Sequence, residues 1–115
     1  MINFKKVSVI GLGKTGISIA NFLADRKNKV FISEILPEEK VKKNLKLLRR
    51  NIQYETGKHS KHILDADIIV KSPGVPDDLP ILVQAREKGI KILSELELSW
   101  SFIHPKKTIA ITGTN

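Results

Sequence analysis

Residues 11–16 read Gly-Leu-Gly-Lys-Thr-Gly, and this stretch decides the fold. It follows an apolar run at residues 6–10, which predicts a buried strand, and it opens a predicted helix at residues 15–27. The first glycine permits a sharp turn, the second lets backbone approach a bound group, and the third lets the helix lie close to the sheet. This context predicts a phosphate or pyrophosphate at the helix N-terminus, with a purely structural turn as the alternative.

Strands and helices alternate along the rest of the chain. Short apolar, β-branched runs indicate the strands, and turn or capping residues separate them from helical segments. Right-handed crossovers between parallel strands leave few arrangements of such a chain. The order therefore predicts an α/β fold, a Rossmann-like open parallel sheet of five strands with helices on both faces. The predicted strands are residues 6–10, 30–34, 52–56, 66–71 and 91–93.

Residues of known capping preference predict where the later helices begin and end. Pro37 is expected to open the second helix, because its missing N–H costs nothing there. Asp78 is expected to cap the next helix, and Gly89 to end it in the left-handed conformation. Ser94 and Glu97 have the spacing of a capping box, which predicts one more helix start.

Length and composition restrict the class of protein. The 115 residues fit one domain with a real core. The chain has no cysteine, which excludes disulfides and thiolate metal sites and suits a reducing cytoplasm. No apolar run approaches the ~20 residues that span a bilayer, and the N-terminus lacks the layout of a signal peptide. We therefore expect a cytoplasmic protein without a membrane partner.

The formal net charge of +8 raises nucleic-acid binding as a function. Basic residues are interleaved with acidic ones along the chain, and only residues 40–50 concentrate them. There Val41, Leu45 and Leu48 fall at helical spacing, so the basic side chains fit the solvated faces of a helix. No aromatic interleaving or known nucleic-acid motif accompanies them. We expect no nucleic-acid partner, although excess positive charge would attract an anionic ligand.

A second loop, Ser-Pro-Gly-Val-Pro at residues 72–76, follows the strand at residues 66–71. Ligands of open α/β sheets bind beyond the carboxyl ends of the strands, so this loop should stand beside the glycine loop. Pro73 stiffens it, Gly74 permits close approach, and Ser72 supplies a hydroxyl donor. We interpret it as a second wall of the site, with an ordinary Pro-Gly turn as the alternative.

Two other positions could carry chemistry. Glu34 lies at about the spacing where dinucleotide-binding folds carry an acid that bonds a ribose hydroxyl. It could contact a ribose or a base, or it could be a solvated loop acid. His59 and His62 are three residues apart, but no third metal ligand lies near them in the sequence. An exposed loop is therefore predicted there, and no metal site.

The last residues have the pattern of a new domain. Residues 104–107, His-Pro-Lys-Lys, predict a hinge in which Pro105 ends the preceding helix. Residues 108–111 predict a strand, and Thr-Gly-Thr-Asn follows it at the end of the chain. A strand that runs into a glycine turn is an unusual way for a domain to end. The pattern indicates a piece cut from a longer protein.

Four motifs in this order resemble the Mur ligases, the ATP-dependent enzymes of peptidoglycan precursor synthesis. The Gly-Leu-Gly-x-Thr-Gly form of the first motif resembles the branch that adds D-glutamate to UDP-N-acetylmuramoyl-L-alanine. The resemblance covers the whole chain. The motifs are the loop at residues 11–16, Ser-Pro-Gly-Val at 72–75, Ser-Glu-Leu-Glu-Leu at 94–98 and Thr-Ile-Ala-Ile-Thr-Gly-Thr-Asn at 108–115.

The resemblance implies that residues 1–103 form an N-terminal domain that binds the UDP part of the substrate. It implies no catalytic residue and no metal site within this chain. Ile35 departs from the family, which often has a small or polar residue at this position. The UDP-binding residues that the resemblance implies are Gly13, Lys14, Thr15, Gly16, Glu34, Ile35, Ser72, Pro73 and Gly74.

The resemblance also implies that residues 108–115 begin a central ATPase domain. Gly113, Thr114 and Asn115 would start its ATP phosphate loop, which continues Gly-Lys-Ser or Gly-Lys-Thr in the family. The full-length enzyme would use ATP and Mg²⁺ to phosphorylate the alanyl carboxylate, which the amine of D-glutamate then attacks. This chain alone is expected to be a monomer that binds no cofactor and is inactive.

Two other functions stay open at this point. An NAD-binding module of a dehydrogenase or regulatory protein would use the same glycines and Glu34. It would not explain the loop at residues 72–76 or the pattern that follows Pro105. A basic nucleic-acid-binding module would require salt-sensitive affinity for DNA or RNA.

Overall fold

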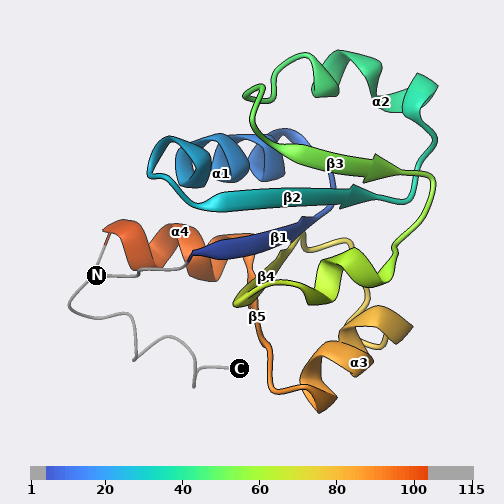
Figure 1. The fold of residues 1–115 in the computed structure, drawn as a ribbon, viewed down its shortest axis with the longest axis vertical. Coiled ribbons are helices and arrows are strands. Elements are labelled where there is room, and N and C mark those ends of the chain that lie inside the picture. The colour runs from blue at the N-terminus through green and yellow to red at the C-terminus, as the bar shows by residue number, and fades with distance from the viewer. Residues whose placement is uncertain (1–4, 104–115) are drawn as a thin grey trace.

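The computed structural model describes residues 5–103, which form a five-stranded sheet covered by helices (Figure 1). All four strand pairings are parallel, and the strand order is β3-β2-β1-β4-β5. The predicted α/β fold is confirmed, and each of the five strands predicted for the sheet is present. The strands are β1 (Lys6–Ile10), β2 (Lys29–Glu34), β3 (Gln53–Thr56), β4 (Ile68–Lys71) and β5 (Lys91–Ser94).

Helices lie on both faces of the sheet, as predicted. One face carries α1, α2 and α4, whose Leu23, Val41 and Leu98 share a buried cluster with the sheet. The other face carries α3 and the short 3₁₀ helix η1, whose Leu82 and Ile63 belong to a second cluster. The helices are α1 (Lys14–Asp25), α2 (Glu38–Leu45), η1 (Lys61–Leu64), α3 (Pro80–Glu87) and α4 (Glu95–Ile103).

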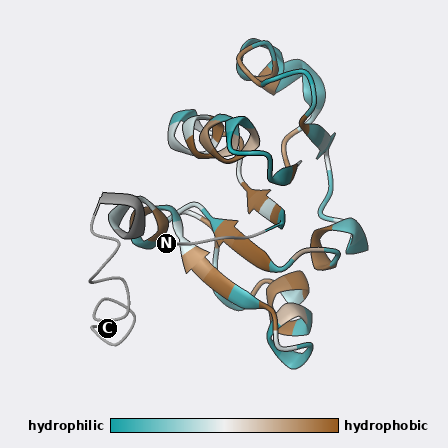
Figure 2. Ribbon diagram, turned by 60° about the vertical axis from the view of Figure 1, so that its left-hand side comes forward, coloured by the Kyte–Doolittle hydropathy of each residue, from teal (hydrophilic) through white to brown (hydrophobic). Residues whose placement is uncertain are grey.

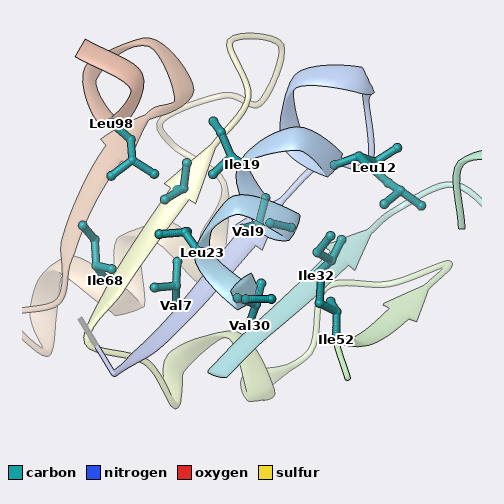
Figure 3. Packing of buried hydrophobic residues seen from close by; sticks show 14 of the residues in the cluster. Val7, Val9, Leu12, Ile19, Leu23, Val30, Ile32, Ile52, Ile68 and Leu98 are labelled. Atoms are coloured by element: carbon teal, nitrogen blue, oxygen red, sulfur yellow. The ribbon is translucent and has the colours of Figure 1, made fainter. Parts of the chain in front are cut away.

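The core follows from the alternation of side chains along the strands. Figure 2 shows apolar residues concentrated in the strands, while the helices carry hydrophilic residues on their outer sides. Figure 3 shows Ile19 and Leu23 of α1 packed over Val7 and Val9 of β1. Full burial of each such aliphatic side chain stabilises the fold by about 1.5–3 kcal/mol. None of the helices within residues 5–103 is long and apolar enough to cross a bilayer.

Helix α1 ends two residues earlier than the predicted residue 27. The N–H of Lys27 donates to the carbonyl of Ala24 at 3.0 Å, and the N–H of Asn28 donates to that of Leu23 at 3.1 Å. The pair is a Schellman motif, which places Lys27 in the left-handed region at φ 69°. A lysine therefore occupies a position that usually carries glycine.

The predicted start of α3 is wrong by one residue. Asp78 does not cap the helix; Leu79 occupies the N-cap position with extended backbone, and no side chain caps the helix there. Pro80 at the first helical position forces this boundary, because its ring disfavours a helical conformation of the preceding residue. The predicted end at Gly89 is confirmed, with φ 79° and a 2.9 Å bond from the N–H of Ile90 to the carbonyl of Ala85.

The other predicted helix starts agree with the structure. Pro37 directly precedes the first residue of α2 in an extended conformation. The capping box of α4 is formed: the Glu97 N–H donates to Ser94 Oγ at 3.0 Å, and the Ser94 N–H donates to Glu97 Oε1 at 2.9 Å. Helix α2 ends at Leu45, so Leu48 packs against the core from a turn beyond the helix.

The strand order creates a topological switch point at the centre of the sheet. From β1 the chain moves to one side to form β2 and β3, and it later returns to the other side of β1 to form β4 and β5. Ile10 at the end of β1 pairs with Ser33 of β2 and with Lys71 of β4. The loops after β1 and β4 therefore leave neighbouring strands at the same level, which is where open α/β sheets bind ligands.

Candidate nucleotide-binding site

The glycine loop and the loop after β4 touch each other, as the sequence predicted. The N–H of Ser72 donates to the carbonyl of Ile10 at 3.1 Å, which ties the second loop to the end of β1. A Cβ on Gly11 would lie only 2.8 Å from Ser72 Oγ. Gly11 also has φ 106°, a conformation that other residues rarely adopt. The turn and the contact with the second loop therefore both require glycine at this position.

Gly16 lets the first turn of α1 rest on the glycine loop. A Cβ at this position would lie 2.5 Å from the carbonyl oxygen of Gly11 and 3.1 Å from Glu95 Oε2. The first of these atoms belongs to the backbone, so it cannot move aside cheaply. The close approach predicted for the third glycine of the motif is present.

Gly13 and Gly74 have no such internal reason. A Cβ on either residue would meet no atom of the described residues within 4 Å, and Gly13 has an ordinary φ of −88°. Both are exposed, at the carboxyl ends of the central strands. Glycine at these positions leaves the backbone accessible to solvent or to a ligand. That accessibility suits a ligand that lies against both loops.

The N-terminus of α1 points toward this exposed backbone. Gly13 occupies its N-cap position, and no side chain caps the helix there. The N–H groups of the first turn, at Lys14 to Gly16, have no partner within the helix, and no acidic residue lies in this turn. Free N–H donors at the positive end of a helix dipole favour an anion. Lys14 and Thr15 are exposed beside them.

Glu34 is buried, so its interpretation as a solvated loop acid is wrong. The residue is 9 % exposed. Its Oε1 accepts the N–H of Leu12 at 2.7 Å, and its Oε2 accepts the N–H of Leu36 at 2.9 Å. The carboxylate thus links the glycine loop to the turn after β2. Ile35 lies in that turn and is 57 % exposed.

Asn44 of α2 holds the other backbone group of Leu12. Its Nδ2 donates to the Leu12 carbonyl at 2.7 Å, across 32 positions of sequence. Glu34 and Asn44 together satisfy both the N–H and the carbonyl of this residue, whose side chain is buried in the core. Asn44 could not be found from the sequence, because no local pattern marks a contact between a helix and a distant loop.

A polar network at the ends of β2 and β3 supports the same turn. Ser33 is fully buried, and its Oγ lies 2.7 Å from Glu55 Oε2, 2.7 Å from His59 Nδ1 and 3.1 Å from the carbonyl oxygen of Lys58. The N–H of Ser60 also donates to Glu55 Oε2, at 2.8 Å. Sequence analysis predicted an exposed loop here; His59 is instead half-buried and bonded.

Proton counting fixes the tautomer of His59. The Ser33 hydroxyl has one proton, whereas the Glu55 carboxylate and the Lys58 carbonyl can only accept. If the hydroxyl donated its proton to His59, the lone pairs of Ser33 Oγ would face the Glu55 carboxylate oxygen at 2.7 Å, and the two oxygens would repel each other. The hydroxyl therefore donates to Glu55, and His59 Nδ1 carries a proton and donates to Ser33. The neutral ring keeps its lone pair at Nε2.

Burial and charge shift two pKa values in this network. Burial lowers the pKa of His59 below its ordinary value, and the Glu34 and Glu55 carboxylates offset part of that shift. Burial raises the pKa of Glu55, but hydrogen bonds from Ser60 and Ser33 and the nearby charge of Lys58 outweigh it, so its pKa lies below the usual value. Neutral histidine and ionised glutamate are the states that the contacts favour.

One hollow lies apart from the two loops, and the described residues form no metal site. A hollow of about 540 Å³ lies where β1 and β2 begin, and neither loop contributes to it. Its lining residues include Lys6, Lys29, Phe31, Lys58 and His62. Within the described part of the chain, no three His, Cys, Asp or Glu side chains are placed to hold a metal ion.

Some predicted features lie outside the described residues. They are the hinge at residues 104–107, the strand at residues 108–111 and the start of the phosphate loop at Gly113, Thr114 and Asn115. The other predicted site residues group around the two loops. Ser72 is half-buried, whereas Pro73 and Gly74 are exposed.

Comparison with known families identifies the domain. A family model described as the N-terminal domain of MurD-like Mur ligases matches residues 5–94. The chain belongs to this family. The match includes the glycine loop, Glu34 and the loop after β4, which are the parts that build the switch-point site.

Curated relatives carry the name UDP-N-acetylmuramoylalanine–D-glutamate ligase. The protein of Koribacter versatilis (strain Ellin345) is 45 % identical over 113 residues, which cover 96 % of this chain and 25 % of the relative. That of Pelobacter propionicus is 44 % identical over 116 residues, covering 99 % of this chain and 26 % of the relative. The chain thus spans about a quarter of the length of these relatives.

Solved structures with the same fold include enzymes of two kinds. The UDP-N-acetylmuramate–alanine ligase MurC of Thermotoga maritima matches with a TM-score of 0.70 and 28 % identity, covering 91 % of this chain and 24 % of that one. Shikimate dehydrogenase of Aquifex aeolicus matches with a TM-score of 0.51 and 21 % identity, covering 80 % and 42 %. The second likeness extends to the fold alone.

Proposed function

We propose that this chain binds the UDP part of UDP-N-acetylmuramoyl-L-alanine, as the N-terminal domain of an ATP-dependent ligase that adds D-glutamate. One observation carries the proposal: the two loops touch at the switch point, and Gly13 and Gly74 leave their backbones open without an internal reason. The names of the curated relatives support the choice of substrate.

Each loop has a part in the proposed site. The diphosphate lies at the N-terminus of α1, where the N–H groups of Lys14, Thr15 and Gly16 are its donors. Ser72 adds a hydroxyl from the second loop, and Pro73 and Gly74 flank the ligand. The uracil lies toward the turn at Glu34 and Ile35. In this arrangement Glu34 acts by holding the loop through Leu12.

The chemical step belongs to the rest of the enzyme. ATP, with Mg²⁺, would activate the alanyl carboxylate as an acyl phosphate, which the amine of D-glutamate attacks. The phosphate loop that begins at Gly113, Thr114 and Asn115 would hold the ATP phosphates. The 115-residue chain therefore binds a substrate as a monomer and does not catalyse the reaction. A cytoplasmic location belongs to the same proposal, and the absence of cysteine agrees with it.

An NAD-binding module is the competing function, and Glu34 argues against it. In NAD-binding folds the acid after the second strand bonds a ribose hydroxyl. Here each oxygen of that carboxylate already accepts a backbone N–H, and the residue is buried. Isothermal titration of the chain with UDP and with NADH separates the two functions. The proposal predicts binding of UDP in the millimolar range or tighter and no binding of NADH; the reverse preference would refute it.

A further inference from the structure

Glu95 is a buried acid with an unpaired oxygen. The residue is 5 % exposed, and its Oε2 has no hydrogen-bond partner among the described residues. Buried carboxylates usually have partners, as Glu34 does for both of its oxygens. An unpaired buried carboxyl group calls for a reason of its own.

Its position connects it with the proposed diphosphate site. Oε2 lies 3.1 Å from the place that a Cβ on Gly16 would occupy, so it sits under the first turn of α1. Gly16 is one of the residues whose N–H groups face the site, and α1 and α4 pack against each other. A diphosphate bound to these N–H groups and a charge on Glu95 would be separated by roughly one helical turn, through a poorly solvated region.

We propose that Glu95 couples diphosphate binding to the uptake of a proton. The inference rests on the proposed function, because it needs a diphosphate at the N-terminus of α1. When Glu95 is ionised, its buried charge repels the ligand, and when it is protonated the repulsion disappears. Ligand binding and protonation of Glu95 therefore favour each other.

Among residues 5–103, the charged groups around Glu95 leave its Oε2 without a counter-ion. On β4, Lys71 pairs with Asp77 at 3.1 Å and donates to the carbonyl of Val75. On α4, Glu97 accepts the N–H of Ser94 in the capping box. Of the remaining charged groups on the packed elements, Asp25 of α1 pairs with Arg49 at 3.0 Å. Lys14 of α1 and Lys91 of β5 are exposed, and within residues 5–103 neither pairs with Glu95 Oε2.

The pKa of Glu95 agrees with this picture. Burial raises it above the ordinary value for glutamate, and no charged neighbour contributes to the shift. A raised pKa makes the protonated form of Glu95 easier to reach, so a nearby diphosphate favours the uptake of a proton.

The test measures the affinity for UDP-N-acetylglucosamine by isothermal titration from about pH 5.5 to pH 8.5. Its diphosphate is esterified at both ends and keeps a constant charge, whereas the terminal phosphate of UDP itself would titrate near pH 6. Affinity of the unsubstituted chain should fall about tenfold across this range, the order expected for one charge at such a distance. Glu95→Gln should bind with the affinity of the acidic limit at every pH. Glu87→Gln, which removes an exposed charge on α3, should keep the full pH dependence.

A second readout needs no substitution. Titrations of the unsubstituted chain in two buffers with different enthalpies of ionisation give the number of protons taken up on binding, which should be measurably greater than zero. Binding without pH dependence and without proton uptake would overturn this inference and leave the proposed function standing. Unchanged pH dependence in Glu95→Gln would overturn it as well. Absence of binding at every pH would overturn both.

Discussion

The carboxylate of Glu34 accepts the backbone N–H of Leu12 at 2.7 Å and thereby holds the centre of the glycine loop. Its other oxygen accepts the N–H of Leu36 at 2.9 Å. The acid at the end of β2 thus fixes the loop from inside the protein. In the proposed function it shapes the site for the diphosphate without having to touch it.

Replacing Glu34 with Gln should therefore act on the glycine loop and lower the stability of the domain. The amide keeps one acceptor oxygen but turns an NH₂ group toward the second backbone N–H, so one buried donor loses its partner. We expect a loss of about 1–3 kcal/mol in the free energy of unfolding, measured by urea denaturation. Glu39→Gln, on the exposed side of α2, should stay within about 0.5 kcal/mol. Equal effects of the two substitutions would contradict the assigned role of Glu34.

Two alanine substitutions should separate folding from binding. Gly16→Ala places a Cβ 2.5 Å from a backbone oxygen and should destabilise the domain by about 1–3 kcal/mol. The Cβ of Gly13→Ala would meet no atom of residues 5–103 within 4 Å, so the domain should keep most of its stability while its affinity for UDP falls. Thermal unfolding and isothermal titration measure the two effects. Unchanged UDP affinity in Gly13→Ala would count against the ligand at this backbone.

Helix α1 should gain stability from a better residue at its end. Lys27 adopts φ 69°, which costs a residue with a side chain about 1 kcal/mol or more. Lys27→Gly should relieve that strain and raise the free energy of unfolding by about 0.5–1 kcal/mol, after the larger entropy of glycine in the unfolded chain is deducted. Lys27→Ala keeps the strain and serves as the control. Urea denaturation should show a gain for glycine alone.

The protonation state of His59 can be observed directly. Nitrogen-15 NMR of the imidazole rings should show a protonated Nδ1 and an unprotonated Nε2 in neutral His59. The titration midpoint of this ring should lie below the ordinary histidine value, because burial lowers its pKa. A neutral His59 protonated at Nε2 would show that the Ser33 hydroxyl is oriented the other way.

The buried carboxyl group of Glu95 should also make the stability of the domain depend on pH. Its pKa is raised in the folded state, so the folded protein binds more protons than the unfolded chain between the two pKa values. The contribution of Glu95 to stability should therefore fall as the pH rises through this window. Glu95→Gln lacks this penalty, so its melting temperature should equal that of the unsubstituted chain near pH 4 and exceed it near pH 8. A variant that is less stable at pH 8 would contradict the assignment.

Local chemistry explains which features the sequence could predict. The strands follow from β-branched apolar runs. The end of α3 at Gly89 and the start of α4 at Ser94 depend on residues within one helical turn. The two loops could be placed together because parallel strands end at one edge of a sheet. At Asp78 one local rule overrode another, because Pro80 set the helix boundary.

The polar contacts that hold the site could not be predicted in this way. Asn44 reaches the glycine loop from α2, and Ser33 meets Glu55 and His59 more than 20 positions away. These partners are brought together by the packing of elements, and no sequence spacing records them. Glu34 was singled out for its position in the strand, yet its burial and its two backbone partners appear only in the fold.

The most direct test of the central claim is a titration of the nitrogen-15-labelled chain with UDP, followed through its backbone amides. If both loops hold the diphosphate, the amides of residues 14–17 and those of Ser72, Gly74 and Val75 should shift together and saturate with one dissociation constant at millimolar ligand or below. Shifts confined to the hollow near Lys6 and Lys29, or no shift in either loop at millimolar UDP, would contradict the account.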